Sequence, residues 1–293
     1  MNLTFPVMAS FIKYPTSSDK IDKNHLLTKK IGYFTAEKEL FERINNELGL
    51  NHYRHPLAFL LEVADDIAYL TADIEDAHRK GLISMRQFRD YLEAEKEDEI
   101  VAFALESMDK YISNAEQMNY DDVEGYVMHR LRVLIKGKMI DSMSQAFEQS
   151  YDAIMNEEFT DELMKVSSAH CIANILRKIE RDNIYYCSNI LENKTRAIAV
   201  ITKLLEVYVP AIVNWREDVD ANTDSSNNLL YLSLSKNYRY MCKVANQKYE
   251  GNQKLSDQDF ETMIYNKILL VTDQISGMTD THALTVYKTL TAS

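Results

Sequence analysis

An acidic stretch from Val63 to His78, VADDIAYLTADIEDAH, holds residues that could bind a cation or a polar ligand. It places five carboxylates in sixteen residues of otherwise helix-forming sequence. Asp65, Tyr69 and Asp73 are four residues apart, so at about 100° per residue they share one face of a helix. Closely set carboxylates repel one another unless a cation, hydrogen-bond donors or water compensate. The alternative interpretation is an ordinary solvated acidic face.

The helix that carries this stretch is predicted to begin at Pro56 and to end near Gly81, since proline suits a first turn and glycine a C-terminus. We name its polar face the acidic strip: Asp65, Tyr69 and Asp73, flanked by Glu62 and Asp66. Its apolar residues form one row of Leu60, Val63, Ile67, Leu70, Ile74 and Ala77, and a second of Leu61, Ala64 and Ala68. Apolar rows this wide are unusual on a surface helix. We therefore expect a mostly buried helix whose acidic strip faces something polar.

Composition limits the class of protein. The chain has 293 residues, 46% of them hydrophobic, with only 7 glycines and 4 prolines, which favours a large, mostly helical core. A net charge of −12 argues against a nucleic-acid groove and suits a cation site. Cys171, Cys187 and Cys242 lack C-x-x-C spacing and suggest reduced thiols in a cytoplasmic protein. No stretch reaches about 18 apolar residues, so we expect no membrane span.

Hydrophobic periodicity predicts an all-α fold. Helices are expected at residues 35–48, 84–92, 97–116 and 121–150, with two or three more between 157 and 215 and a final pair over 258–287. Residues 218–228, DVDANTDSSNN, form the clearest predicted loop. No strand pair, hairpin signal or internal repeat is visible.

Other constellations are weaker. His52 and His55 are three apart but flank a proline break, and a zinc site there would need further ligands. No P-loop, G-x-G-x-x-G or G-x-S-x-G motif occurs. Lys13, Lys29 and Lys30 lie beside aromatic residues and could hold phosphates, although surface lysines are common.

A family resemblance follows from longer segments. RHPLAFLLEVADDIAYLTADIEDA, residues 54–77, closely resembles a signature segment of bacterial dGTP triphosphohydrolases of the HD superfamily. MNLTFPVMASFIKYP and KKIGYFTAEKELF resemble the segments that precede it, and VTDQISGMTDTHALTVYKTLT, residues 271–291, resembles the C-terminal signature. The resemblance implies part of a helical HD-type phosphohydrolase domain at residues 1–155 and a helical phosphohydrolase-associated region at 156–293.

The resemblance also implies roles for single residues. Family members bind a divalent metal, Mg²⁺ or Mn²⁺, through a His, a His-Asp pair and a later Asp that resembles Asp65. Tyr69 resembles the tyrosine that packs against the deoxyribose, and Asp73 the aspartate that accepts the 3′-hydroxyl. The groups that resemble those near the triphosphate are Asn2, Lys13 and Lys30. The implied reaction hydrolyses dGTP or another dNTP to deoxynucleoside and tripolyphosphate, and the resemblance identifies no catalytic group in this chain.

The chain departs from the family pattern in its metal ligands. It contains no His-Asp dipeptide, and the family's first His and His-Asp pair should lie upstream of the Asn2-Leu3-Thr4 segment. We therefore expect a C-terminal portion with an incomplete metal site, inactive alone, its N-terminal part absent or supplied in trans. We also expect a homo-oligomer, and apolar residues left exposed between Leu3 and Ile12. The alternatives are a non-catalytic nucleotide-binding or oligomerisation module, and a plain helical scaffold.

Overall fold

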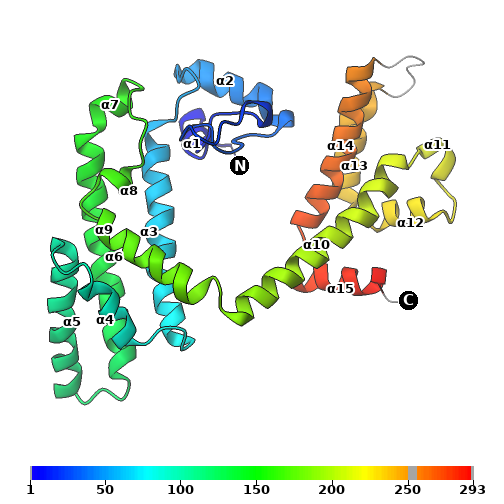
Figure 1. The fold of residues 1–293 in the computed structure, drawn as a ribbon. Coiled ribbons are helices and arrows are strands. Elements are labelled where there is room, and N and C mark those ends of the chain that lie inside the picture. Colours follow the sequence, from blue (N-terminus) through cyan, green and yellow to red (C-terminus); the bar gives the residue numbers. More distant parts are fainter. Residues whose placement is uncertain (1, 250–255, 292–293) are drawn as a thin grey trace. The chain divides into compact units, whose positions relative to one another are not determined.

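The predicted all-α architecture is confirmed. The computed structural model describes residues 2–249 and 256–291, and within these ranges it contains helices and turns but no strand (Figure 1). The chain separates into two compact units, Met1–Cys187 and Ser188–Ser293. The predicted division at residue 155 came from the family resemblance and remains a prediction, whereas the boundary between compact units lies at residue 187.

The first unit contains every helix predicted before residue 150. Its elements are α1 (Phe5–Ser10), η1 (Ser18–Lys20), η2 (Thr35–Glu37), α2 (Lys38–Leu48), α3 (Pro56–Arg79), α4 (Met85–Glu93), α5 (Glu99–Gln117), α6 (Val123–Gln149), α7 (Tyr151–Met155), α8 (Leu163–Val166), α9 (His170–Ile179) and the π-helical turn η3 (Glu180–Ile184). The periodicity at 35–48, 84–92, 97–116 and 121–150 is thus realised as η2 with α2, α4, α5 and α6.

Helix α3 is the central element of this unit. The side chain of His55 caps its start by accepting the Leu57 N–H, and Pro56 occupies its first turn as predicted. The chain leaves the helix through Gly81, whose φ of +68° favours glycine. Helix α3 packs against α1, α6, α8, α9 and η3. Its first apolar row is buried from Val63 to Ala77, and Leu60 is half-buried. Figure 1 shows α3 beside α6 and α9. The acidic strip is therefore carried on a well-supported scaffold.

The prediction that α3 is mostly buried was wrong for its second apolar row. Leu61 is 45% exposed, and Ala64 and Ala68 are also exposed. Neighbouring helices cover only one side of α3 in the described residues, so part of the apolar circumference remains at the surface. Near the N-terminus Leu3, Val7 and Phe11 are exposed as expected, whereas Phe5, Met8 and Ile12 are half-buried.

The second unit contains α10 (Ser188–Asn214), α11 (Glu217–Asp220), α12 (Ser226–Ser233), α13 (Lys236–Asn246), η4 (Gln247–Tyr249), α14 (Asp257–Ser276) and α15 (Asp280–Thr291). The final pair is confirmed. The predicted loop at 218–228 was too long, because α11 and α12 take residues from both of its ends. Ser225 caps α12 through the Asn228 N–H, and serine and asparagine serve helix starts as well as loops.

One helical segment, Ile190–Asn214 in α10, is long and apolar enough to cross a membrane by length and composition alone. The sequence analysis did not predict this segment, because it found no stretch of about 18 apolar residues. Its residues Val200, Leu204, Tyr208 and Ile212 belong to the hydrophobic core of the second unit. Only 28% of the apolar window is buried, and Leu191, Ile198 and Ile201 of the same helix are exposed.

Candidate functional site

A buried ionic network joins the N-terminal segment to the head of α3. The Arg54 side chain is fully buried; its Nε donates to the Lys13 carbonyl oxygen at 2.6 Å, and its Nη1 pairs with Glu62. The Lys13 ammonium lies 2.8 Å from the other Glu62 oxygen. Burial lowers the pKa of Lys13, but the hydrogen bond and charge of Glu62 raise it more, so the net shift is upward. Lys13 is therefore held charged beside the acidic strip.

The segment that carries Lys30 packs directly on the segment that carries Lys13. The Gly32 N–H donates to the Thr16 carbonyl oxygen at 3.0 Å. A Cβ atom on Gly32 would lie 1.4 Å from the Tyr14 carbonyl oxygen, so only glycine permits this approach. The two predicted phosphate-binding segments are thus neighbours, although the Lys30 side chain itself is exposed and no contact places it at the strip.

The acidic strip is open to solvent at its centre. Asp65 is exposed, and Tyr69, at 62% exposure, is the most exposed large hydrophobic side chain on α3. Asp66 is neutralised by Arg177 of α9, whose Nη2 lies 2.9 Å from an Asp66 oxygen. Two carboxylates of the strip, Glu62 and Asp66, are therefore paired with cations, while Asp65 and Tyr69 are presented to solvent.

Asp73 lies at the far end of the strip and is half-buried. Burial raises the pKa of its carboxyl group, the charge of Asp76 raises it further, and Lys80 opposes the shift. Asp73 forms no ion pair within the described residues. A neutral hydrogen-bond donor, such as a sugar hydroxyl, would therefore displace no cation from this carboxylate. Asp65, Tyr69 and Asp73 thus share one face of α3, and Lys13 contacts Glu62 at the head of the same helix.

Two predicted groups are not brought to this face, and three of its neighbours were missed. Asn2 is exposed and forms no hydrogen bond within the described residues, and the exposed Lys30 side chain has no contact with the strip there. The missed residues are Arg54, Arg177 and Glu180. Arg54 lies two residues before Pro56, where α3 begins, and its place in the quoted signature was the only local signal available. The two on α9 and η3 are over 100 residues from the strip, so no spacing pattern could connect them.

A divalent metal does not fit the described residues alone. Within residues 2–249 and 256–291, no group of three or more His, Cys, Asp or Glu side chains is arranged to hold an ion. Asp65 therefore offers at most one ligand, and a metal site of this chemistry needs several. A zinc site at His52 and His55 is not formed by the described residues either. His52 Nε2 lies 3.6 Å from a Glu42 carboxylate oxygen.

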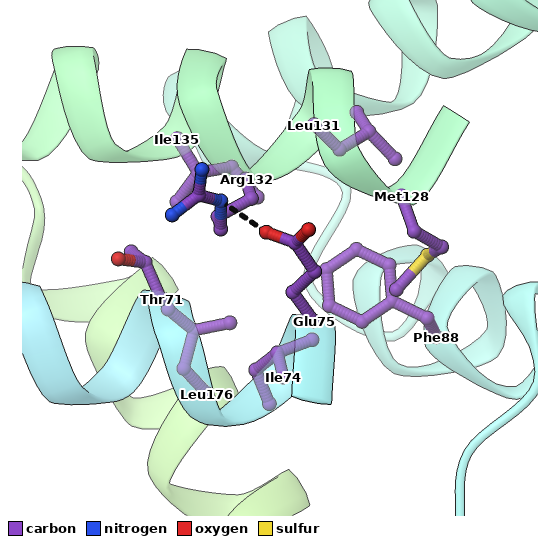
Figure 2. Close-up of a pocket in the computed structure, with 9 residues that line it drawn as sticks. All are labelled: Thr71, Ile74, Glu75, Phe88, Met128, Leu131, Arg132, Ile135 and Leu176. Atoms are coloured by element: carbon purple, nitrogen blue, oxygen red, sulfur yellow. Dashed lines mark ion pairs between the residues drawn. The ribbon is translucent and has the colours of Figure 1, made fainter. Parts of the chain in front are cut away.

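A second ionic cluster lies deeper on α3 and is structural. Figure 2 shows the Glu75 carboxylate pointing at Arg132 of α6 among apolar side chains. Glu75 is 7% exposed and also pairs with Arg79, while His129 Nδ1 lies 3.2 Å from it. The enclosed space in this cavity is about 10 Å³, enough for no more than one water. The cluster ties α3 to α6 and leaves no room for a substrate.

Comparison with known proteins finds relatives that are named dGTP triphosphohydrolases or proteins like them. No protein-family model matches it. It is 35% identical over 99% of its length to a "Deoxyguanosinetriphosphate triphosphohydrolase-like protein" of Listeria monocytogenes serovar 1/2a, and equally similar to that of Listeria innocua serovar 6a. It is 27% identical over its full length to a "Deoxyguanosinetriphosphate triphosphohydrolase" of Yersinia pestis (strain Pestoides F). The chain spans 60% of the length of each of these relatives.

Proposed function

We propose that this chain, whose resemblance to the dGTP triphosphohydrolases these matches confirm, supplies the deoxynucleotide-binding face of such a hydrolase. The reaction would release deoxynucleoside and tripolyphosphate from dGTP or another dNTP. One observation carries the proposal: Asp65, Tyr69 and Asp73 share one face of α3, Lys13 is paired with Glu62 at the head of that helix, and the tyrosine ring is uncovered. An amphipathic ring flanked by a cation and a carboxylate suits a sugar with a phosphate on one side and a hydroxyl on the other.

Each residue would have a distinct task. The Lys13 ammonium would offset charge on the phosphates, and Glu62 would hold it until a polyphosphate competes for it. The exposed Tyr69 ring would stack on the deoxyribose and leave little room for a 2′-hydroxyl. Asp73 would accept the 3′-hydroxyl. Asn2 and Lys30 are proposed to join the phosphate side when ligand is bound.

Asp65 is proposed as one ligand of Mg²⁺ or Mn²⁺. The remaining ligands would have to lie outside the described residues, in the same polypeptide or in a second chain acting in trans. When bound, such an ion would polarise a phosphoryl oxygen. Exposed apolar residues of α10, among them Ile198 at 67% exposure, support the further proposal that the chain assembles with copies of itself. Three free cysteines support a cytoplasmic setting.

Nucleotide binding and tripolyphosphate release test this function separately. We expect dGTP to bind the purified chain, and Tyr69→Ala to weaken binding at least about fivefold, since stacking on an aromatic ring contributes about 1–3 kcal/mol. Tyr240→Ala, which removes a 67%-exposed tyrosine from α13, is the matched control and should bind like the parent. No binding by the parent chain, with Mg²⁺ or Mn²⁺ present, would refute the proposal.

A second candidate function is nucleotide binding without turnover. The absence of a three-group metal cluster in the described residues favours it for the chain acting alone. Binding of dGTP without tripolyphosphate release would support this candidate. Release that depends on Asp65, lost in Asp65→Ala, would support the hydrolase.

A further inference from the structure

A hollow in the second unit is lined by side chains that the proposed function does not use. Helices α10, α11, α12, α13 and α14, with the chain between α10 and α11, surround a space of about 390 Å³. Small-molecule sites usually measure about 300–1,000 Å³. The apolar wall of the hollow is formed by Ile212, Trp215, Tyr231, Met263 and Leu270. All of these residues belong to the second unit, so the hollow lies within one compact body.

The aromatic part of the wall is held in place by contacts of its own. The Trp215 and Tyr231 rings are stacked, with centroids 3.7 Å apart and planes 13° from parallel. The indole N–H of Trp215 donates to the side-chain oxygen of Asn228, which is 4% exposed. The guanidinium carbon of Arg239 lies 5.2 Å from the centre of the Tyr231 ring. A wall fixed in this way needs little ordering when a ligand binds, which favours affinity.

The ammonium group of Lys267 is a cation of this hollow without an anionic partner. It donates to the carbonyl oxygens of Val213 and Trp215, at 2.9 and 2.7 Å. These bonds occupy two of its three N–H donors. No carboxylate in the described part of the chain forms an ion pair with it, and burial lowers the pKa of Lys267 while Cys242 and Asp220 oppose the shift. An anion that reached this half-buried ammonium would therefore gain a charge-assisted hydrogen bond.

The thiol of Cys242 does not supply that anion. It lines the hollow, and the Asn246 side-chain N–H₂ lies 3.8 Å from its Sγ as a donor. Burial raises the pKa of Cys242, with Lys267 opposing the shift, so the neutral thiol is favoured. A neutral thiol behaves as a small apolar group. Cys242 thus extends the apolar wall up to the ammonium.

The other charges around the hollow also favour an anion. Among the described residues that line it, the carboxylate is that of Glu217, and the Lys243 ammonium already lies 2.9 Å from it. Arg216 lines the hollow as well and forms no ion pair in the described ranges. Together with Lys267, it leaves two cations uncompensated in a chain whose net charge is −12. Clefts lined by one sign of charge attract ligands of the opposite sign.

We propose that the second unit binds a small monocarboxylate with an apolar body, seated in this hollow with its carboxylate on Lys267. One N–H of the ammonium remains for that bond, and Arg216 adds a second cation. A phosphate group usually takes more donors than this wall offers. The apolar wall would cover the rest of the molecule and remove it from water. The site lies in a different compact unit from the acidic strip and does not rest on the proposed function.

Calorimetric titration of the full chain with octanoate tests the site, and octanamide is the matched neutral ligand. We expect one octanoate to bind with a Kd below about 1 mM, and octanamide to bind at least about tenfold more weakly, because it lacks the charge. Acetate and inorganic phosphate carry charge without the apolar body and should not bind at the same concentrations. No binding of octanoate, equal affinity for octanoate and octanamide, or phosphate binding as tight as that of octanoate would each overturn the proposal.

Three variants locate the ligand. Lys267→Gln keeps a donor for the two carbonyl oxygens but removes the charge, so it should weaken octanoate at least about tenfold and octanamide less than about twofold. Met263→Trp fills the hollow and should abolish binding of both ligands. Lys236→Gln, the control, removes an exposed cation from the start of α13 that does not line the hollow, and should bind like the parent.

The ratio of the two affinities separates a charge contact from a structural role for Lys267. A merely structural lysine would lose octanoate and octanamide equally on replacement by glutamine, and that result would overturn the proposal. If Lys267→Gln does not fold, Met263→Trp decides instead. Octanoate binding that survives in Met263→Trp would place the ligand elsewhere and overturn the proposal, whereas its loss there, with binding kept in Lys236→Gln, would support the hollow as the site.

Discussion

Replacement of Arg54 by methionine should strongly destabilise the first unit. The arginine is fully buried, its Nε hydrogen bond to the Lys13 carbonyl oxygen is 2.6 Å long, and its guanidinium carbon lies 4.9 Å from the centre of the Phe59 ring. Arg54→Met keeps the apolar stem but leaves the Glu62 carboxylate, itself 10% exposed, without its buried counter-charge. Removing one partner of a buried pair costs about 3–5 kcal/mol.

The lower end of this range applies here, because Lys13 remains 2.8 Å from Glu62 and retains part of the compensation. We expect a loss of about 3 kcal/mol in the free energy of unfolding. With a urea dependence of about 1–3 kcal/mol per molar, the midpoint should fall by about 1–3 M. Amide hydrogen exchange of α3 should accelerate, and Trp215, the only tryptophan, provides a fluorescence reporter for the second unit.

Two controls separate the buried charge from general disruption. Lys13→Met removes the partner that is 37% exposed, and such pairs contribute about 1 kcal/mol or less. The double variant Arg54→Met/Glu62→Met removes both buried charges and should be more stable than Arg54→Met alone, since apolar replacement of a whole buried pair is close to neutral. An Arg54→Met protein within about 0.5 kcal/mol of the parent, or a double variant less stable than the single one, would refute this reasoning.

Three further predictions concern local features. Gly32→Ala should cost at least about 2 kcal/mol and weaken tripolyphosphate binding measured by calorimetry, because its Cβ would lie 1.4 Å from the Tyr14 carbonyl oxygen; unchanged stability would contradict the close approach. Asp98→Ala should cost about 1 kcal/mol in urea unfolding, since Asp98 accepts from two backbone N–H groups that begin α5. Lys267→Met should lower the midpoint of Trp215 fluorescence by the equivalent of about 1–3 kcal/mol, because the Lys267 ammonium donates to the carbonyl oxygens of Val213 and Trp215.

The sequence predicted what local periodicity and capping determine. Pro56 and Gly81 bracket α3 as expected, and the four-residue spacing does place Asp65, Tyr69 and Asp73 on one face. What it could not determine is which apolar row finds a partner, because Leu61 is as hydrophobic as the buried Leu70 and only tertiary packing distinguishes them. Long-range pairs such as Arg177 with Asp66 were equally out of reach, since no local pattern links residues 111 positions apart.

The alternatives for the acidic strip differ in what they require of its surroundings. A solvated face on a helical scaffold needs no support, and its charges would be offset by water. Instead a fully buried arginine fixes Glu62 and the Lys13 backbone together, at the expense of burying a charge. The adjoining Leu61 row is apolar and uncovered, which is costly in water. A fixed cation beside α3, with an exposed aromatic ring and an uncovered apolar row on that helix, together favour a face built to receive a ligand or a further segment of protein.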